Sequence, residues 1–262
     1  MDVHAKPRPS RRQWLTAAGA AMGSLWLSAC DKLSNNPKVT AGLQSAEGLT
    51  MRVQRAITDR KALAREFTPA DISPDFKANG TLRPQDEAYQ TLLADNFADY
   101  RLEVDGLVET PLALTLAELR AQPARTQITR HDCVEGWSAI GKWKGARLGP
   151  LLDRAKLKPN ARFIVFHCAD TLEQTLDGTG QYYESIDLID AYHPQTILAY
   201  EMNDATLMVG HGAPLRLRVE RQLGYKQAKY IMRIEAVESL ADLGRGKGGF
   251  WEDRGNEWYA GI

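Results

Sequence analysis

The fold is decided by residues 130–138, which read Arg130-His131-Asp132-Cys133-Val134-Glu135-Gly136-Trp137-Ser138. Residues 126–130 are expected to form a β-strand, so Cys133 should lie in a polar turn directly after that strand. A thiolate is a soft, strongly donating metal ligand, and the neighbouring Arg130 and His131 favour the thiolate form. The residues alone leave two interpretations of Cys133 open: a metal-binding thiolate, or an inert thiol that is half buried.

Three further segments carry side chains that suit binding or catalysis. They are residues 166–170 (FHCAD), residues 182–186 (YYESI), and residues 211–216 (HGAPLR) with the following residues 224–229 (GYKQAK). The second segment places aromatic hydroxyls beside an expected helix start. In the third, Arg216 and Lys229 lie near glycines that let backbone N–H groups approach a ligand, which is what a phosphate needs. A solvated cationic face is the alternative for this third segment.

The rest of the chain predicts short strands and short helices in no regular order. Strands are expected at residues 100–108, 126–130, 162–168, 196–202, 215–219 and 229–237. Short helices are expected at residues 51–67, 148–157 and 185–191. A further short helix is expected to begin with a capping box at Thr115. Because no βαβ rhythm is visible, we predict an α+β fold with mixed β-sheets and short helices.

The first 30 residues are typical of an export signal with a candidate lipoprotein processing site. Arg11 and Arg12 precede an apolar run at residues 16–29 that is too short to span a bilayer. This predicts export to the periplasm by the twin-arginine route, with an ordinary secretory signal as the alternative. The run ends Leu-Ser-Ala-Cys, so a lipid on Cys30 would be the protein's contact with a membrane; simple cleavage without a lipid is the alternative.

The chain therefore divides into three parts. Residues 1–30 are the signal, residues 31–95 are a polar, proline-interrupted tether and wrapping segment, and residues 96–262 are the main domain. Thirty-three Lys plus Arg balance 33 Asp plus Glu, which argues against a nucleic-acid-binding protein. Three cysteines are too few for a disulfide framework and lack zinc-site spacing, although spacing leaves a Cys133–Cys168 bridge open.

Taken together, these motifs resemble the sulfite oxidase superfamily of molybdopterin-binding oxidoreductases, and most nearly its bacterial methionine-sulfoxide reductase branch. The Cys-Val-Glu-x-Trp-Ser motif begins at Cys133, and residues 198–203 (LAYEMN) lead to His-Gly-x-Pro-x-Arg at residues 211–216. The resemblance covers residues 100–240. It implies a sulfite-oxidase-type molybdopterin-binding fold.

The resemblance also implies a molybdenum–molybdopterin cofactor whose metal is bound by Cys133. The implied cofactor-binding residues are Asn79, Cys133, Cys168, His211, Arg216, Gln227, Ala228 and Lys229, with Cys168 acting through its backbone. The implied catalytic residues are Cys133, Tyr182 and Glu135. Tyr182 would face the open position of the metal, and Glu135 would lie near the substrate entrance.

The implied function is oxygen-atom transfer on a small sulfur compound or sulfoxide. Electrons would be exchanged with a haem protein, either a membrane cytochrome b or a soluble cytochrome c, because the sequence has no Cys-x-x-Cys-His of its own. Sulfite oxidation is one alternative, although the Arg-x-His-x-Pro segment of sulfite oxidases is not visible. A lipid-anchored, non-catalytic binding protein that retains the fold is a second alternative.

The C-terminal part of the chain adds three expectations. The sequence ends at Ile262 without the β-sandwich domain through which sulfite oxidases dimerise, so a monomer is expected. Residues 248–262 are rich in aromatic side chains and are expected to pack as a strap rather than to serve as a docking surface. The basic loop at residues 226–229 suggests a pterin that ends in a simple phosphate.

Overall fold

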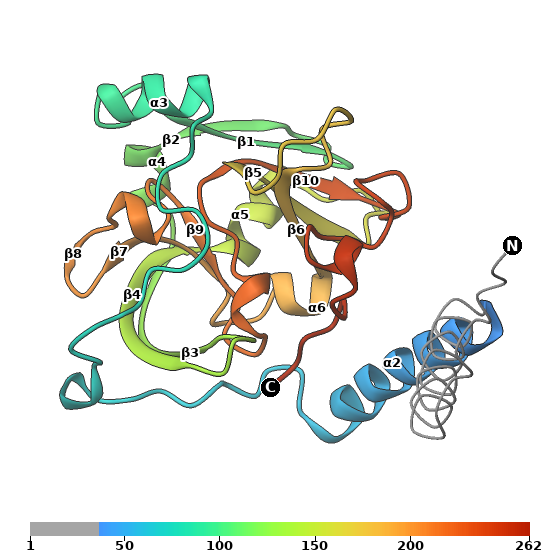
Figure 1. The fold of residues 1–262 in the computed structure, drawn as a ribbon. Helices are drawn as coiled ribbons and strands as arrows, with labels where there is room; N and C mark the ends of the chain where they lie inside the picture. Colours follow the sequence, from blue (N-terminus) through green and yellow to red (C-terminus); the bar gives the residue numbers. More distant parts are fainter. Residues whose placement is uncertain (1–36) are drawn as a thin grey trace, which may run out of the picture. The chain divides into compact units, whose positions relative to one another are not determined.

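The computed structural model describes residues 37–262 (Figure 1). The expected export signal and Cys30 lie outside the described residues. Helix α2, Pro37–Ile57, begins the described chain, and the contacts divide the protein into two compact units between Gln54 and Arg55. The sheets and the cavity described below lie in the second unit, residues 55–262. Among the described residues, no helix combines the length and the apolar character that crossing a bilayer requires.

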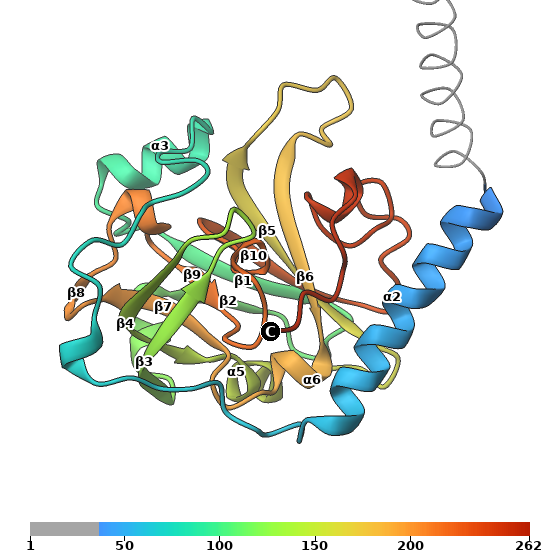
Figure 2. The ribbon, with the colours of Figure 1, turned by 60° about the horizontal axis from the view of Figure 1, so that its bottom comes forward.

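The first of two sheets has five strands in the order β2-β1-β10-β5-β6 (Figures 1 and 2). Its strands are β1 (Arg101–Gly106), β2 (Leu112–Thr115), β5 (Phe163–Thr171), β6 (Gln181–Asp187) and β10 (Ile231–Val237). Strands β1 and β10 run parallel, whereas the other neighbours are antiparallel. The sheet is therefore mixed, as predicted.

The second sheet is antiparallel and contains the turn in which Cys133 lies. Its strands are β3 (Ala124–Asp132), β4 (Ser138–Arg147), β7 (Ile197–Met202) and β8 (Ala205–Thr206), with β9 (Arg216–Arg218) paired to β7. Strands β3 and β4 form a long hairpin whose last pair is Asp132 with Ser138. The five residues between them, 133–137, are therefore the hairpin turn that holds Cys133.

One apolar core joins the two sheets. Helix α5, Leu148–Ala155, buries Leu148, Leu151, Leu152 and Ala155 at helical spacing, as its sequence predicts. The same cluster contains Ile164 of β5 and Leu198 of β7, one from each sheet. Burial of each leucine side chain stabilises the folded protein by roughly 1.5–3 kcal/mol, so the shared core keeps the two sheets packed against each other.

The other helices are short, as expected for this α+β fold. They are α3 (Glu87–Ala94), α4 (Leu116–Arg120), α6 (Leu188–Ala191) and the 3₁₀ turns η1 (Pro69–Asp71), η2 (Val209–His211), η3 (Gly224–Lys226) and η4 (Glu252–Arg254). The predicted capping box opens α4: Thr115 Oγ1 accepts from Glu118 N, and Glu118 accepts from Thr115 N. Cys133 and Cys168 are both free thiols, so no bridge joins them.

Two expected helices are placed differently. The helix predicted at residues 51–67 is instead α2, which ends at Ile57. The helix predicted at residues 185–191 shrinks to the four residues of α6, because β6 continues to Asp187 and pairs with β5 up to that residue. Residues 182–186 are all buried, so pairing and packing on both faces outweigh the local helical pattern.

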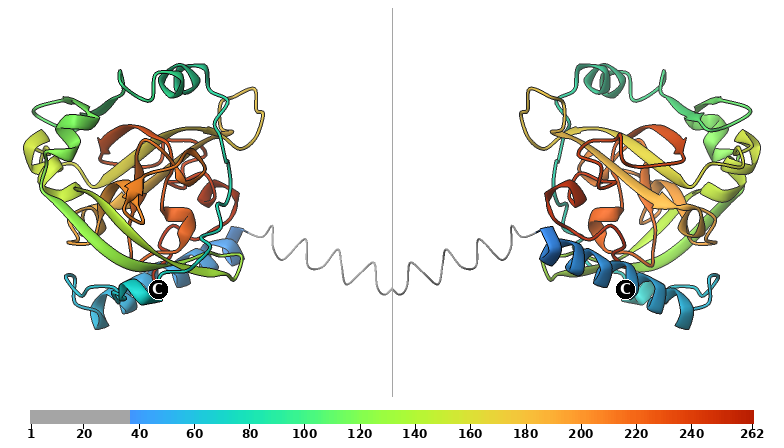
Figure 3. Two further views of the ribbon diagram at one scale, coloured as in Figure 1. Left: turned by 90° about the vertical axis from the view of Figure 1, so that its left-hand side faces the viewer. Right: turned by 90° about the vertical axis from the view of Figure 1, so that its right-hand side faces the viewer.

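The segment between α2 and α3 follows the outside of the second sheet. Phe67 N donates to Ile128 O at 2.9 Å, and Ser73 N donates to Ile140 O at 3.0 Å. Figure 3 shows this segment, coloured cyan to teal, running along one side of the domain to α3. It brings residues 76–81 to the mouth of the hairpin turn.

Candidate active site

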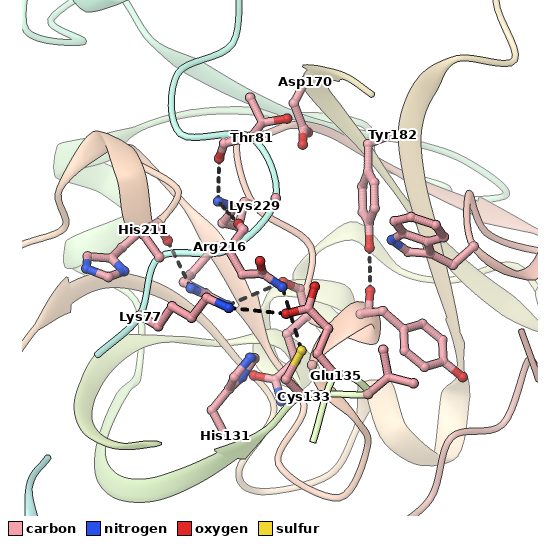
Figure 4. Close-up of a pocket in the computed structure, with 18 of the residues that line it drawn as sticks. Lys77, Thr81, His131, Cys133, Glu135, Asp170, Tyr182, His211, Arg216 and Lys229 are labelled. Atoms are coloured by element: carbon pink, nitrogen blue, oxygen red, sulfur yellow. Dashed lines mark hydrogen bonds and ion pairs between the residues drawn. The ribbon is translucent and has the colours of Figure 1, made fainter. Parts of the chain in front are cut away.

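A cavity of 360 Å³ lies where five segments distant in the sequence meet (Figure 4). It is lined by residues 76–81, by the β3–β4 turn, by the ends of β5 and β6, by seven residues between Gly210 and Lys229, and by Trp251 and Asn256 near the C-terminus. All the expected site residues line it except Cys168 and Ala228. This volume is within the range of small-ligand sites.

Cys133 begins the hairpin turn and is half buried at the cavity wall. Its N–H donates to Trp137 O at 2.9 Å, and its carbonyl accepts from Gly136 N at 3.0 Å. Gly136 has a φ of 86°, a left-handed conformation that glycine adopts without strain. The Val-Glu-Gly-Trp sequence that follows the cysteine therefore closes a tight turn that fixes the direction of the thiol.

The donor that reaches the thiol is not one of the cations expected from the sequence. Asn79 Nδ2 lies 3.6 Å from Cys133 Sγ. Arg130 is instead paired with Asp132 at 2.9 Å on the exposed side of the strand. An amide N–H directed at sulfur stabilises a thiolate and adjusts its donor strength without adding charge.

The second expected cation, His131, is neutral because of its surroundings. Burial, followed by the charges of Arg218 and Arg216, holds the pKa of the His131 imidazole well below its usual range. Arg218 Nη1 lies 3.1 Å from His131 Nδ1, and a guanidinium only donates, so the ring proton resides on Nε2. Arg218 is itself fully buried and paired with Glu220 at 2.6 Å. This network fixes the strand end directly before Cys133.

At another wall of the cavity, Arg216 is a buried cation without a carboxylate partner among residues 37–262. Its Nη1 donates to His211 O at 3.0 Å and its Nη2 to Gln227 O at 3.5 Å. Its Nε has no partner among these residues. Burial, followed by the charge of Arg218, lowers the pKa of Arg216 to about 9. Such a group favours an anion that would compensate its charge.

Lys229 adds a second cation close by and connects two walls. Its Nζ donates to Asn79 O at 2.8 Å, to Thr81 O at 2.6 Å and to Gly210 O at 3.1 Å. Burial, followed by the charge of Arg216, lowers the pKa of Lys229 to about 7. The backbone beside it requires glycine: Gly212 has a φ of 109°, and a Cβ there would lie 2.9 Å from Lys229 Cβ.

Asp170 also lines the cavity; it ends the segment 166–170 singled out in the sequence, although no role is predicted for this residue there. It lies near the end of β5 and is 3% exposed. Its Oδ1 has no hydrogen-bond partner in the described part of the chain. Burial raises the pKa of the Asp170 carboxyl to about 6, although Lys229 acts in the opposite direction. A polar residue ending a buried apolar strand was the only signal for it in the sequence.

Glu135 forms the exposed rim of the cavity, next to the exposed Val134. Its Oε2 accepts from Trp137 Nε1 at 3.0 Å and lies 3.3 Å from Lys77 Nζ. Hydrogen bonds from Trp137, Asn79 and Lys77 lower the pKa of Glu135. Glu135 is therefore a carboxylate at neutral pH, placed at the exposed rim of the cavity.

Tyr182 lines the cavity, but its hydroxyl is already engaged. The hydroxyl donates to Tyr225 O, and the ring stacks on Phe250 with centroids 5.7 Å apart. Burial, followed by the charges of Glu184 and Glu252, raises the pKa of the Tyr182 phenol well above its usual range. A hydrogen bond from Tyr182 to a ligand would require this contact to open.

The remaining two expected residues are buried behind the cavity. Cys168 belongs to the apolar core, with its Sγ 3.8 Å from Phe166 O and its carbonyl accepting from Gln181 Nε2. Ala228 accepts from Leu217 N at 2.8 Å through its carbonyl. The structure therefore places both next to the site through their neighbours, and neither side chain in its lining.

Comparison with known proteins identifies the family. Residues 89–242 match the model of the oxidoreductase molybdopterin-binding domain. The chain belongs to this family. The resemblance read from the motifs is thereby confirmed, and so is the class of enzyme: a molybdopterin-dependent oxidoreductase of the sulfite oxidase type.

The chain is similar to two curated proteins and to one solved structure. A putative protein-methionine-sulfoxide reductase subunit, YedZ1, of Azospira oryzae is 35% identical over 97% of this chain and 88% of its own length. The protein-methionine-sulfoxide reductase catalytic subunit MsrP of Campylobacter jejuni is 34% identical over 55% of this chain, which spans 51% of that relative. The sulfane dehydrogenase SoxCD of Paracoccus pantotrophus has a TM-score of 0.48 and 24% identity, over 54% of this chain and 39% of its own.

The donor set of the cavity fits a molybdopterin. The unpartnered Arg216 Nε and the neighbouring Lys229 suit its phosphate, and the unpartnered Asp170 Oδ1 suits the N–H groups of its pterin ring. No group of three or more His, Cys, Asp or Glu side chains within residues 37–262 could hold a metal ion.

Proposed function

We propose that this member of the family is an exported molybdenum–molybdopterin enzyme that reduces a sulfoxide. One observation carries the proposal: the half-buried Cys133 shares one cavity with Arg216 and Lys229, two cations that lack a carboxylate partner within residues 37–262. A thiol at one wall and unpaired cations at another are what a metal–pterin with a phosphate end requires. The names of the relatives from Azospira and Campylobacter support a sulfoxide as substrate.

Each wall of the cavity would hold a different part of the cofactor. Cys133 would bind the metal, Arg216 would bind the phosphate through its unpartnered Nε, and Lys229, whose three N–H groups are engaged by carbonyls, would add positive charge nearby. Asp170 would accept from the pterin ring, and His211, at a different part of the lining, would contact the cofactor separately. The backbone of residues 227–229 would approach the phosphate, which is where Gln227 and Ala228 would contribute. When bound, the molybdenum centre supplies two-electron oxygen-atom exchange.

The protein's own groups would control the thiol and the entrance. Asn79 would donate to the sulfur ligand and adjust its donor strength, as it does to the free thiol at 3.6 Å. Glu135, ionised and exposed at the rim, would accept or pass on protons that the reaction consumes. Tyr182 would support the wall through its bond to Tyr225 O, and it would donate into the cavity only after that bond opens.

The reaction balances with an external electron source. A sulfoxide, two electrons and two protons give a sulfide and one water molecule. The electrons would come from a haem protein, a membrane cytochrome b or a soluble cytochrome c, since the chain has no haem-attachment motif. Export by the twin-arginine route with the cofactor already inserted, and a lipid on Cys30, would place the enzyme at a membrane face in the periplasm.

The test uses protein purified from its own export route. Bound metal and pterin are identified by mass spectrometry, and turnover is assayed in both directions. Reduced viologen serves as donor with methionine sulfoxide or dimethyl sulfoxide, and cytochrome c serves as acceptor with sulfite. We expect one molybdenum per chain and sulfoxide reduction. Correctly exported protein without molybdenum, or one that oxidises sulfite and reduces no sulfoxide, would refute the proposal.

A further inference from the structure

Three charged side chains form a buried cluster next to residues that line the cavity. Glu184 belongs to β6, Lys226 to η3 and Glu252 to η4, and none of the three is more than 3% exposed. Lys226 Nζ lies 2.5 Å from Glu184 Oε1 and 2.5 Å from Glu252 Oε1. Ser185 N donates a further hydrogen bond to Glu184 Oε1 at 2.7 Å. One ammonium group thus attaches three segments of the chain to one another.

The cluster contains more acidic than basic groups. If all three side chains were ionised, two carboxylates would share one ammonium and a negative charge would remain. Glu184 Oε2 and Glu252 Oε2 both lack a hydrogen-bond partner among residues 37–262. Because a buried charge without a partner costs free energy, the fully ionised cluster is unfavourable.

The other ionisable groups that surround the cluster supply no compensating charge. Burial raises the pKa of Tyr182 and Tyr183 on β6 and of Cys168 on β5, so all three groups are neutral. On η4, the Asp253 carboxylate accepts from Tyr183 Oη at 2.8 Å. The cation of η4, Arg254, is paired with a carboxylate between β5 and β6 at 2.5 Å. The imbalance therefore has to be removed within the cluster.

A proton bound by the two carboxyl groups removes it. Burial, followed by the charge of Glu252, raises the pKa of the Glu184 carboxyl well above its usual range. The two groups also approach each other: a Cβ on Gly249 would lie 2.0 Å from Glu252 Oε2 and 2.8 Å from Glu184 Oε1. Both oxygens are therefore close to one point, and such a pair titrates as a unit that holds one proton tightly.

The cluster lies beside the contact that occupies the Tyr182 hydroxyl. Tyr182 is two residues before Glu184 on β6, and Tyr225 directly precedes Lys226. The Tyr182 hydroxyl donates to Tyr225 O (Figure 4). The donor and the acceptor of this bond are thus carried by two segments that the cluster attaches to each other.

The C-terminal strap, residues 248–262, packs on the same strand, as expected from its aromatic side chains. Phe250 N donates to Tyr183 O at 3.0 Å, and Trp258 Nε1 donates to Ser185 Oγ at 2.9 Å. Since η4 belongs to this strap, the buried cluster also attaches the strap to β6.

We infer that Glu184, Lys226 and Glu252 hold one proton between them and that they position Tyr182. With the proton, the cluster is neutral, η3 and η4 stay attached to β6, and the Tyr182 hydroxyl stays on Tyr225 O. Without it, the two carboxylates repel each other, the attachment loosens, and the Tyr182 hydroxyl becomes free to donate into the cavity. The proton itself is independent of the proposed function, whereas the effect on a ligand rests on it.

Infrared spectroscopy detects the proton directly, because a carboxylic acid has a C=O stretching band that a carboxylate lacks. Spectra are recorded at pH 8 for the loaded wild type, Glu184→Gln, Glu252→Gln and the control Asp170→Asn. Asp170, with a pKa of about 6, is ionised at this pH and contributes no such band. We expect a band that both Gln variants lose and the control keeps. A wild type without the band overturns the inference, and a band that survives in Glu252→Gln would belong to Glu184 alone and overturn the shared proton.

Hydrogen exchange tests the attachment across the pH range in which the infrared band disappears. After correction for the intrinsic rate, exchange of the strap backbone, including Phe250 N–H, should rise by about tenfold in wild type. Glu184→Gln, which is uncharged at this position at every pH, should show no such rise. Equal exchange in both proteins overturns the positioning role, and so does a band that persists until the protein unfolds.

Calorimetric titration with dimethyl sulfoxide tests the effect on a ligand. Its affinity for the loaded wild type should rise by about two- to tenfold when the proton is lost, the scale of one hydrogen bond. Tyr182→Phe and Glu184→Gln should show no rise, and a rise in Tyr182→Phe would show that Tyr182 is not the group released. If dimethyl sulfoxide binds at no pH, the proposed reaction falls, while the infrared and exchange results still decide the shared proton and the attachment.

Discussion

Replacing Asp170 by asparagine should reveal whether the cavity contains a pterin ring. The Asp170 carboxyl is buried, and one of its oxygens lacks a partner among the described residues. In protein made without the cofactor, ionising this group costs free energy because nothing donates to that oxygen. In loaded protein, donors from the pterin ring should remove most of that cost. Asp170→Asn keeps the shape and has no charge at any pH.

The size of the pH-dependent loss of folding stability follows from the pKa of Asp170, which is about 6 in the folded protein against 3.8 for an unperturbed carboxyl. Because the folded-state pKa is the higher one, the folded state binds the proton more tightly, and stability falls as the pH rises from below 3.8 through 6. The full loss is about 3 kcal/mol, and about half of it occurs between pH 5 and pH 8. The asparagine variant should show no such loss at this site.

The assay is urea unfolding of cofactor-free and loaded protein at pH 5 and pH 8, with wild type and Asp170→Asn compared at each pH. Without the cofactor, the free energy of unfolding of Asp170→Asn should rise relative to that of wild type by about 1.5 kcal/mol between pH 5 and pH 8. With the cofactor bound, this relative change should be much smaller. If the free energies of unfolding of wild type and variant change equally with pH in the absence of the cofactor, burial does not raise the pKa of Asp170. Equal shifts with and without it would show that Asp170 does not contact the cofactor.

Three further changes test the rest of the site. Cys133→Ser should keep the pterin but lose activity and alter the optical spectrum of the metal centre; unchanged turnover would rule out the thiolate ligand. Lys226→Met leaves two buried carboxylates without their cation and should lower the free energy of unfolding, measured in urea, by about 3–5 kcal/mol. A loss below about 1 kcal/mol would mean that these buried ion pairs do not hold the C-terminal strap, residues 248–262, in place. Gly212→Ala forces a side chain into a left-handed backbone against Lys229 and should lower both stability, by about 1–3 kcal/mol, and pterin content. Its control is Gly178→Ala, which has a φ of 74° but open space around it, and equal losses in the two variants would show that the contact with Lys229 is unimportant.

Local patterns predicted the elements whose signal is contained within one segment. The apolar run before Cys168 became β5, the spacing from Leu148 gave α5, and the capping box at Thr115 opens α4. Strand β6 was missed, because its burial on both faces depends on β5 and on the strap rather than on its own sequence. The extent of α2 was misjudged for a related reason: a polar segment has no clear periodicity to mark its ends.

The candidate site was predictable where residues of one motif stay close in sequence. The turn around Cys133 and the segment from His211 to Lys229 could be assigned to one cavity by resemblance, and the structure places them there. Asp170, Trp251 and Asn256 were not assigned, since each acquires its place only when distant segments meet. Neither could the pairing of Arg130 with Asp132 be foreseen, since it depends on which side of β3 the guanidinium occupies.

The single nitrogen of Lys229 joins parts of the chain that are about 150 residues apart. Its three carbonyl partners belong to the amino-terminal segment and to the turn before His211, so neither can move away without giving up bonds that the other shares. Any widening of the cavity at this wall therefore breaks hydrogen bonds to both segments at once.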